Sequence, residues 1–192
     1  GTPIPVANLP VDEAVYGTNL YRPDIPLLFE EARTQLDLGA DDVGIFGNTE
    51  LLDGFGWSTY PGYGEAVGAE YEELFDDKKE GAPAGDDSPI FDDFESRIES
   101  GPPRLLLANC HDVDRAGHYG EGNAYIDDVK KLDGLVADFW TWLRDAQPQY
   151  TDDLLVFFVA DHGRHDHDED NGWHNHGDAC VGCREIPMLV LG

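Results

Sequence analysis

Apolar residues follow two kinds of pattern in the C-terminal half of the chain. Continuous apolar runs occupy residues 104–108, 154–159 and 186–191, and runs of this length are typical of strands covered on both faces. Between the first two runs, residues 123–145 carry apolar side chains at alternating steps of four and three. These are Tyr125, Val129, Leu132, Val136, Phe139 and Leu143. Their spacing predicts a helix with one face toward a core.

The order strand, helix, strand predicts a right-handed parallel unit. The expected fold class is therefore α/β, with a mainly parallel central sheet sandwiched by helices. A length of 192 residues and a hydrophobic content of 41% are enough for one compact core, so we expect a single domain over residues 1–192.

The N-terminal half has weaker signals. Residues 25–36 predict a helix with Leu28, Ala32 and Leu36 on its apolar stripe, and residues 43–46 predict a short strand. Further along, residues 54–68 form a loop rich in glycine and aromatic residues. Residues 76–89 are rich in acidic residues, glycine and proline, which predicts a flexible loop or linker.

The chain is strongly acidic, with 12 Lys and Arg against 40 Asp and Glu and a formal net charge of −28. This charge disfavours binding to nucleic acid or to an anionic membrane. No apolar run reaches the roughly 18 to 20 residues of a membrane span. We expect a periplasmic or secreted protein, with a salt-adapted source as one explanation of the charge. The sequence leaves the oligomeric state open.

Residues of the types that bind metals follow two of the predicted strands and precede the third. An Asp-x-x-x-His motif comes first, an Asp-His-Gly motif second and a His-Gly motif last. Their residues are Asp114, His118, Asp161, His162, Gly163, His176 and Gly177. Sites in α/β sheets form beyond the carboxyl ends of strands, and carboxylate with imidazole suits zinc or manganese.

This ordered set resembles the ligand signature of the alkaline phosphatase superfamily, above all its nucleotide pyrophosphatase/phosphodiesterase and sulfatase-like branches. The resemblance covers residues 103–192 well and residues 23–68 more weakly. It implies two divalent metal ions, zinc as the first choice and manganese or calcium as alternatives. One ion would be held by Asp114, His118 and His176, and the other by Asp161 and His162.

The resemblance implies a hydrolase that cleaves a small anionic phosphate ester through a covalent intermediate. A sulfatase and a phosphate mutase are alternatives within the superfamily. A non-catalytic acidic metal-binding or structural subunit is an alternative from another class.

One expected part of the family pattern is missing from the sequence. Residues 1–19 contain no apolar strand that ends in Asp before a Thr or Ser, and no sulfatase-type Cys-x-Pro-x-Arg motif occurs. We therefore expect the nucleophile to lie upstream, which would make the α/β domain incomplete at its N-terminus. The alternative is a protein that has lost its nucleophile. Within the chain, the first candidates to test are Thr2, Thr18, Ser58 and Thr59.

Three residues next to the motifs have open roles. Asp112 would either orient a ligand or be a surface acid. Arg164 would contact an anionic substrate or be solvated. His174 competes with His176 for the ligand position, but the glycine after His176 favours His176. His174 would then support a ligand or be exposed.

Two further features have less specific patterns. Residues 165–170 alternate His with acidic residues, and we interpret them as a solvated loop rather than a dedicated metal site. Cys180 and Cys183 form a single Cys-x-x-Cys, for which a local disulfide or two buried thiols is favoured over a zinc knuckle. With Cys110, the three cysteines leave the redox compartment open.

Overall fold

A computed structural model describes residues 22–47, 54–69, 71–73, 86–101, 103–120, 122–150, 153–178 and 180–192. The chain divides into two compact units, Gly1–His111 and Asp112–Gly192, and each is described by itself. The expectation of one domain over residues 1–192 stays a prediction. None of the described helices combines the length and the apolar character that crossing a membrane requires.

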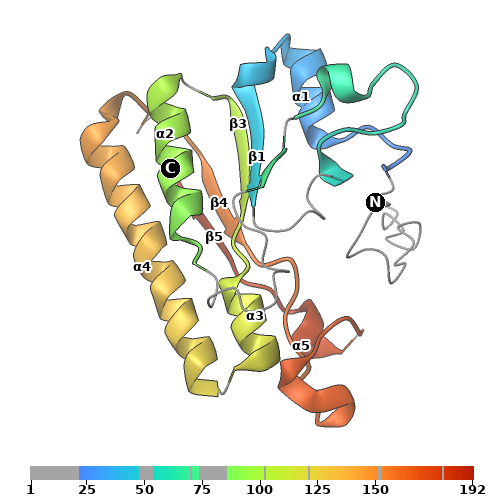
Figure 1. Cartoon of the computed structure of the whole chain (residues 1–192), viewed down its shortest axis with the longest axis vertical. Coiled ribbons are helices and arrows are strands. Elements are labelled where there is room, and N and C mark those ends of the chain that lie inside the picture. Colours follow the sequence, from blue (N-terminus) through green and yellow to red (C-terminus); the bar gives the residue numbers. More distant parts are fainter. Residues whose placement is uncertain are drawn as a thin grey trace. The chain divides into compact units, whose positions relative to one another are not determined.

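The first unit is built on a parallel three-stranded sheet in the order β2-β1-β3. Its strands are β1 (Val43–Gly47), β2 (Tyr71–Glu73) and β3 (Leu105–Asn109), and Figure 1 shows β1 beside β3. Every residue of β1 is buried, as expected for a central strand. Helices α1 (Leu28–Leu36) and α2 (Ser88–Ser100) belong to this unit, with short 3₁₀ turns at Ala40–Asp42 and Glu65–Val67.

Helix α1 confirms the predicted helix but not its predicted stripe. Leu28 and Leu36 are 67% and 66% exposed, whereas Phe29 is buried in a cluster with Val43 and Ile45. The next residue, Glu30, is also buried. The inner face is therefore set by residues 29 and 30.

The second unit contains the long helix α4 (Gly122–Ala146) packed against α3 (Asp112–Tyr119). Figure 1 shows these two helices side by side. The prediction of a helix over residues 123–145 is confirmed, and its apolar stripe is most deeply buried at Phe139 and Leu143. A 3₁₀ turn at Pro148–Tyr150 follows.

The rest of the second unit is a two-stranded antiparallel sheet with its connecting segment. Strand β4 (Val156–Val159) pairs with β5 (Met188–Leu191). Between them lie a 3₁₀ turn at Glu169–His174 and the short helix α5 (Val181–Arg184).

The expected sheet is only partly observed. The α/β composition holds, but the described strands form two sheets, and β3 and β4 belong to different ones. The residues of β4 also alternate between half-buried and exposed, so the two faces of this strand are not both covered. One face of the antiparallel pair exposes Phe157, Val159, Met188 and Val190. The three continuous apolar runs therefore predicted β3, β4 and β5, but not the partners of these strands or how they are covered.

The predicted acidic loop at 76–89 lies largely outside the described residues. The C-terminal end of this segment differs from the predicted loop, because Ser88 and Pro89 are the first residues of α2. Proline is well tolerated in the first turn of a helix, where its missing N–H would have no partner.

Candidate metal centre

Helix α3 carries the first two predicted ligands on one face. Asp114 and His118 are four residues apart, so their side chains meet across one helical turn. The His118 Nε2 atom lies 3.4 Å from Asp114 Oδ2. The side chains at the two ends of α3 also suit the helix dipole. Acidic Asp112 and Asp114 lie in the first turn, and His118 lies in the last.

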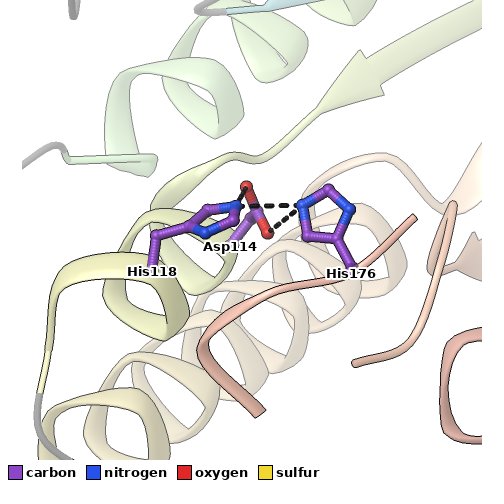
Figure 2. A group of neighbouring side chains, drawn as sticks. All are labelled: Asp114, His118 and His176. Carbon is purple, nitrogen blue, oxygen red and sulfur yellow. Dashed lines mark hydrogen bonds and ion pairs between the residues drawn. The ribbon is translucent and has the colours of Figure 1, made fainter. Parts of the chain in front are cut away.

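His176 reaches the same point from the segment after the Glu169–His174 turn, as Figure 2 shows. Its Nε2 atom is 2.9 Å from His118 Nε2 and 3.5 Å from Asp114 Oδ1. The backbone N–H of His176 donates to Asn175 Oδ1, which helps to hold this segment. The structure thus brings together Asp114, His118 and His176, all three half-buried.

The spacing of these three groups suits a metal ion. Two ligand atoms that each lie about 2.0 Å from a tetrahedral ion are about 3.3 Å apart. The three contacts in this cluster measure 2.9, 3.4 and 3.5 Å. One carboxylate with two imidazoles also leaves a coordination position for water or substrate, as in catalytic zinc sites.

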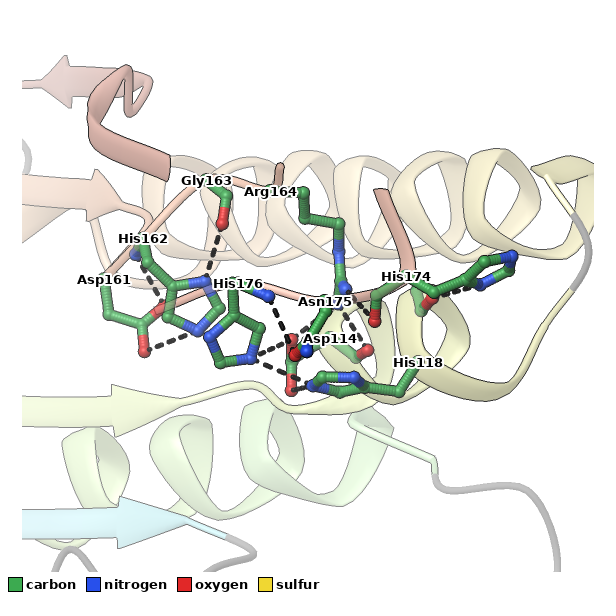
Figure 3. A network of polar contacts seen from close by, with 10 residues as sticks. Asp114, His118, Asp161, His162, Gly163, Arg164, His174, Asn175 and His176 are labelled. Carbon is green, nitrogen blue, oxygen red and sulfur yellow. Dashed lines mark hydrogen bonds and ion pairs between the residues drawn. The ribbon is translucent and has the colours of Figure 1, made fainter. Parts of the chain in front are cut away.

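Asp161 and His162 lie at the edge of this cluster, as Figure 3 shows. The His162 ring stacks on His176 with centroids 3.7 Å apart and planes at 19°. Asp161 is 79% exposed, and its contacts are with its neighbour, the His162 N–H at 3.0 Å and Nε2 at 3.5 Å. Within the described part of the chain, this pair gathers no third ligand group of its own.

Arg164 is bound to the cluster rather than solvated. Its guanidinium donates to Asp114 Oδ1 at 2.5 Å and to the Asp114 carbonyl at 2.6 Å, and its side chain is 12% exposed. Another N–H donates to the His174 carbonyl at 3.3 Å. Arg164 therefore holds one candidate ligand in position (Figure 3).

Gly117 makes the approach of Arg164 possible, and sequence reasoning missed it. A Cβ atom at Gly117 would lie 2.0 Å from Arg164 Cζ. The Gly117 carbonyl in turn bonds to His174 Nδ1 at 3.0 Å. His174 thus supports helix α3, while His176 joins the cluster.

Asp112 is a buried residue and not a surface acid. Its carboxylate contacts Arg115 at 3.2 Å and Lys131 of α4 at 3.4 Å. Asp112 helps to fix the helix that carries Asp114, and its role as a residue that orients a ligand stays a prediction.

Burial lowers the pKa of His176 below its ordinary value. The neighbouring His162 lowers that pKa further, and together these effects outweigh the opposite effect of Asp114. His176 is therefore neutral at neutral pH, which is the form in which imidazole binds a metal ion.

The candidate nucleophiles within the chain differ in accessibility. Ser58 is 1% exposed and its hydroxyl accepts the Tyr60 N–H, which makes it a structural residue. The exposed Thr59 donates its hydroxyl to the Pro23 carbonyl. Thr2 and Thr18 lie outside the described residues.

Cys180 and Cys183 form no disulfide, which leaves the second of the two alternatives, a pair of thiols, with Cys183 buried and Cys180 half-buried. The expectation of a solvated loop over residues 165–170 is wrong for one residue. His165, assigned to a solvated loop, is 6% exposed. The alternating His and Asp pattern did not predict that a histidine would be buried close to two thiols.

Comparison with known proteins gives one match. A sequence model of the type I phosphodiesterase / nucleotide pyrophosphatase family matches residues 48–180, a stretch that includes all five predicted metal ligands. No curated protein and no solved structure matches significantly. The match confirms the resemblance to the alkaline phosphatase superfamily, and at family level it supports a phosphate ester hydrolase. The chain belongs to the type I phosphodiesterase / nucleotide pyrophosphatase family.

Proposed function

We propose that this protein is a metal-dependent hydrolase of phosphodiester or pyrophosphate bonds, with one divalent ion held by Asp114, His118 and His176. The supporting observation is the spacing of their ligand atoms, 2.9 to 3.5 Å, which suits one ion. The mixed carboxylate and imidazole set favours zinc, with manganese as the next choice.

The protein groups have separate parts in this proposal. A bound ion would polarise a phosphoryl oxygen and stabilise the charge that develops on it. Arg164 holds the Asp114 carboxylate in place through its 2.5 Å contact. The neutral His176 offers a lone pair to the ion. Asp161 and His162 are proposed as ligands of a second ion, completed by residues outside the described ranges.

Metal binding is the first test. Zinc titration by calorimetry should show a site that His118→Ala and Asp114→Asn each weaken by more than the roughly 10- to 100-fold expected for a supporting residue. Lys130 and Asp127 form an exposed ion pair on α4, so Asp127→Asn is the matched control and should leave affinity unchanged. Equal affinity in all four proteins would overturn the proposed ligand set.

Ester cleavage is the second test. The full-length protein, loaded with zinc, should hydrolyse a bis-aryl phosphodiester in preference to an aryl sulfate. His118→Ala should abolish the activity and Asp127→Asn should retain it. Faster cleavage of the sulfate would favour a sulfatase. Metal binding without cleavage of either ester would favour the non-catalytic subunit.

A further inference from the structure

A second group of ligand-type side chains lies in the same unit and shares no residue with the candidate metal centre. The ligand atoms of His165, Asp178 and Cys183 all lie within 4.8 Å of one another. Cys180 and His167 belong to an adjoining group of the same kind. These five side chains come from two short segments, residues 165–167 and 178–183.

His165 is the first observation that indicates a ligand. Its side chain is 3% exposed, and neither ring nitrogen has a hydrogen-bond partner among the described residues. Its Nε2 atom faces Asp178 Oδ2 at 3.6 Å, beyond hydrogen-bond distance. A buried imidazole without partners is costly, and most buried polar groups in proteins are satisfied. A metal ion between these groups would satisfy it.

The cysteines provide the second observation. The Cys183 N–H donates to Cys180 Sγ at 3.4 Å, and both residues lie on one turn at the start of α5. The Cys180 N–H donates to Asp178 Oδ1 at 2.8 Å. Because Asp178 Oδ2 also accepts from His167 Nε2 at 2.8 Å, the Asp178 carboxylate lies close to the imidazoles of His165 and His167 and to the Cys183 thiol.

We propose that this cluster is a structural site for a thiophilic divalent ion of the zinc type. The ligands would be His165, Asp178 and Cys183, whose ligand atoms lie together. Cys180 of the adjoining group would be the fourth ligand, which gives a closed tetrahedral set of two sulfurs, one nitrogen and one oxygen. His167 bonds to Asp178 and orients it. Binding replaces the two thiol protons, which are released to solvent.

An ion bound at this site would link the segment that carries His162 to the segment that carries His176. These segments already touch through the backbone, since the Gly163 N–H donates to the Cys183 carbonyl at 2.9 Å. A Cβ at Gly163 would lie 1.9 Å from the Gly182 carbonyl oxygen, so only glycine permits this approach. An open hollow of about 420 Å³ is lined by His165 and Asp178 together with His176. The hollow gives an ion a route from solvent.

Cobalt binding to the reduced full chain tests the proposal. Because Co²⁺ bound to thiolate absorbs in the near ultraviolet by charge transfer from sulfur, titration should produce this band. Cys183→Ser should remove most of the band and Cys180→Ser should weaken it. Cys110→Ser is the matched control and should keep the full band. His118→Ala should also keep it, so this result does not depend on the proposed hydrolase site.

A second measurement uses the unaltered protein, in case a serine variant fails to fold. Zinc should slow the reaction of Cys180 and Cys183 with a thiol reagent by more than about tenfold and leave Cys110 unchanged. Absence of the sulfur-to-cobalt band, or a band that persists in the Cys180→Ser, Cys183→Ser double variant, would overturn the proposal. Equal reactivity of the two thiols with and without zinc would do the same.

Discussion

Gly117 is a single residue on which the geometry of a candidate ligand depends. It lies on α3 between Asp114 and His118, and the guanidinium of Arg164 occupies the space where a side chain would be. An added methyl group would force the end of the Arg164 side chain to move, because the conflicting atom is the flexible terminus and not the backbone. The contact between Arg164 and Asp114 would be lost with it.

Gly117→Ala should therefore weaken zinc binding roughly 10- to 100-fold, as Arg164→Ala should, without altering any ligand. Gly134→Ala is the matched control, because Gly134 lies on α4 with open space around its Cβ position. That variant should keep its zinc affinity and gain about 0.5 to 1 kcal/mol of stability. Calorimetric titration measures the affinities. Unchanged affinity in Gly117→Ala would show that Arg164 does not position Asp114.

At the scale of elements, one buried carboxylate attaches helix α1 to the loop that follows β1. Glu30 is 0% exposed and accepts the N–H groups of Leu27 at 2.8 Å, Ser58 at 2.8 Å and Gly64 at 2.9 Å. Burial raises the pKa of Glu30, but these hydrogen bonds outweigh burial and the pKa is lowered from its ordinary 4.5. The ionised form therefore stabilises the folded chain.

The lowered pKa has a defined consequence for stability against pH. The contribution of Glu30 is present above the unfolded pKa of 4.5 and is lost as pH falls through the lower folded value. At about pH 7, Glu30→Gln should cost roughly 1 to 3 kcal/mol, and the difference should shrink towards about pH 3. Urea unfolding at both pH values measures it, with the exposed Glu65→Gln as control. A cost that does not change with pH would refute this account.

Elements and motifs defined by local spacing could be predicted from sequence. The period of α4 and the Asp114/His118 spacing are properties of a single helix. What could not be predicted depends on distant partners. The burial of Glu30 requires N–H donors from Ser58 and Gly64, and the pairing of β4 with β5 is not encoded in the hydrophobicity of either strand. The burial of His165 is also absent from the local pattern, which suggested a solvated segment.

At the scale of the whole molecule, both proposed metal sites belong to the second unit, Asp112–Gly192. Binding to the folded form stabilises it by about 2.7 kcal/mol at a free concentration of 100 times Kd. Zinc should therefore slow amide exchange in α3 and in residues 162–178 by up to about 100-fold, while β1 should change little. Hydrogen exchange with and without zinc measures this, with magnesium as control for ions attracted by acidic charge. Equal protection in both units would contradict the assignment.

The exposed face of the β4–β5 sheet has a consequence for the behaviour of the protein as a colloid. This face carries an exposed apolar patch made of Phe157, Val159, Met188 and Val190. Because the chain has a net charge of −28, electrostatic repulsion between molecules opposes contact through the patch. The range of that repulsion falls from about 10 Å in 0.1 M salt to about 3 Å in 1 M salt. Light scattering should therefore show self-association that grows with salt. Phe157→Lys should suppress it, whereas Ile126→Lys, which alters an exposed apolar residue on α4, should not. Scattering independent of salt in all three proteins would mean that the patch does not attract a second molecule.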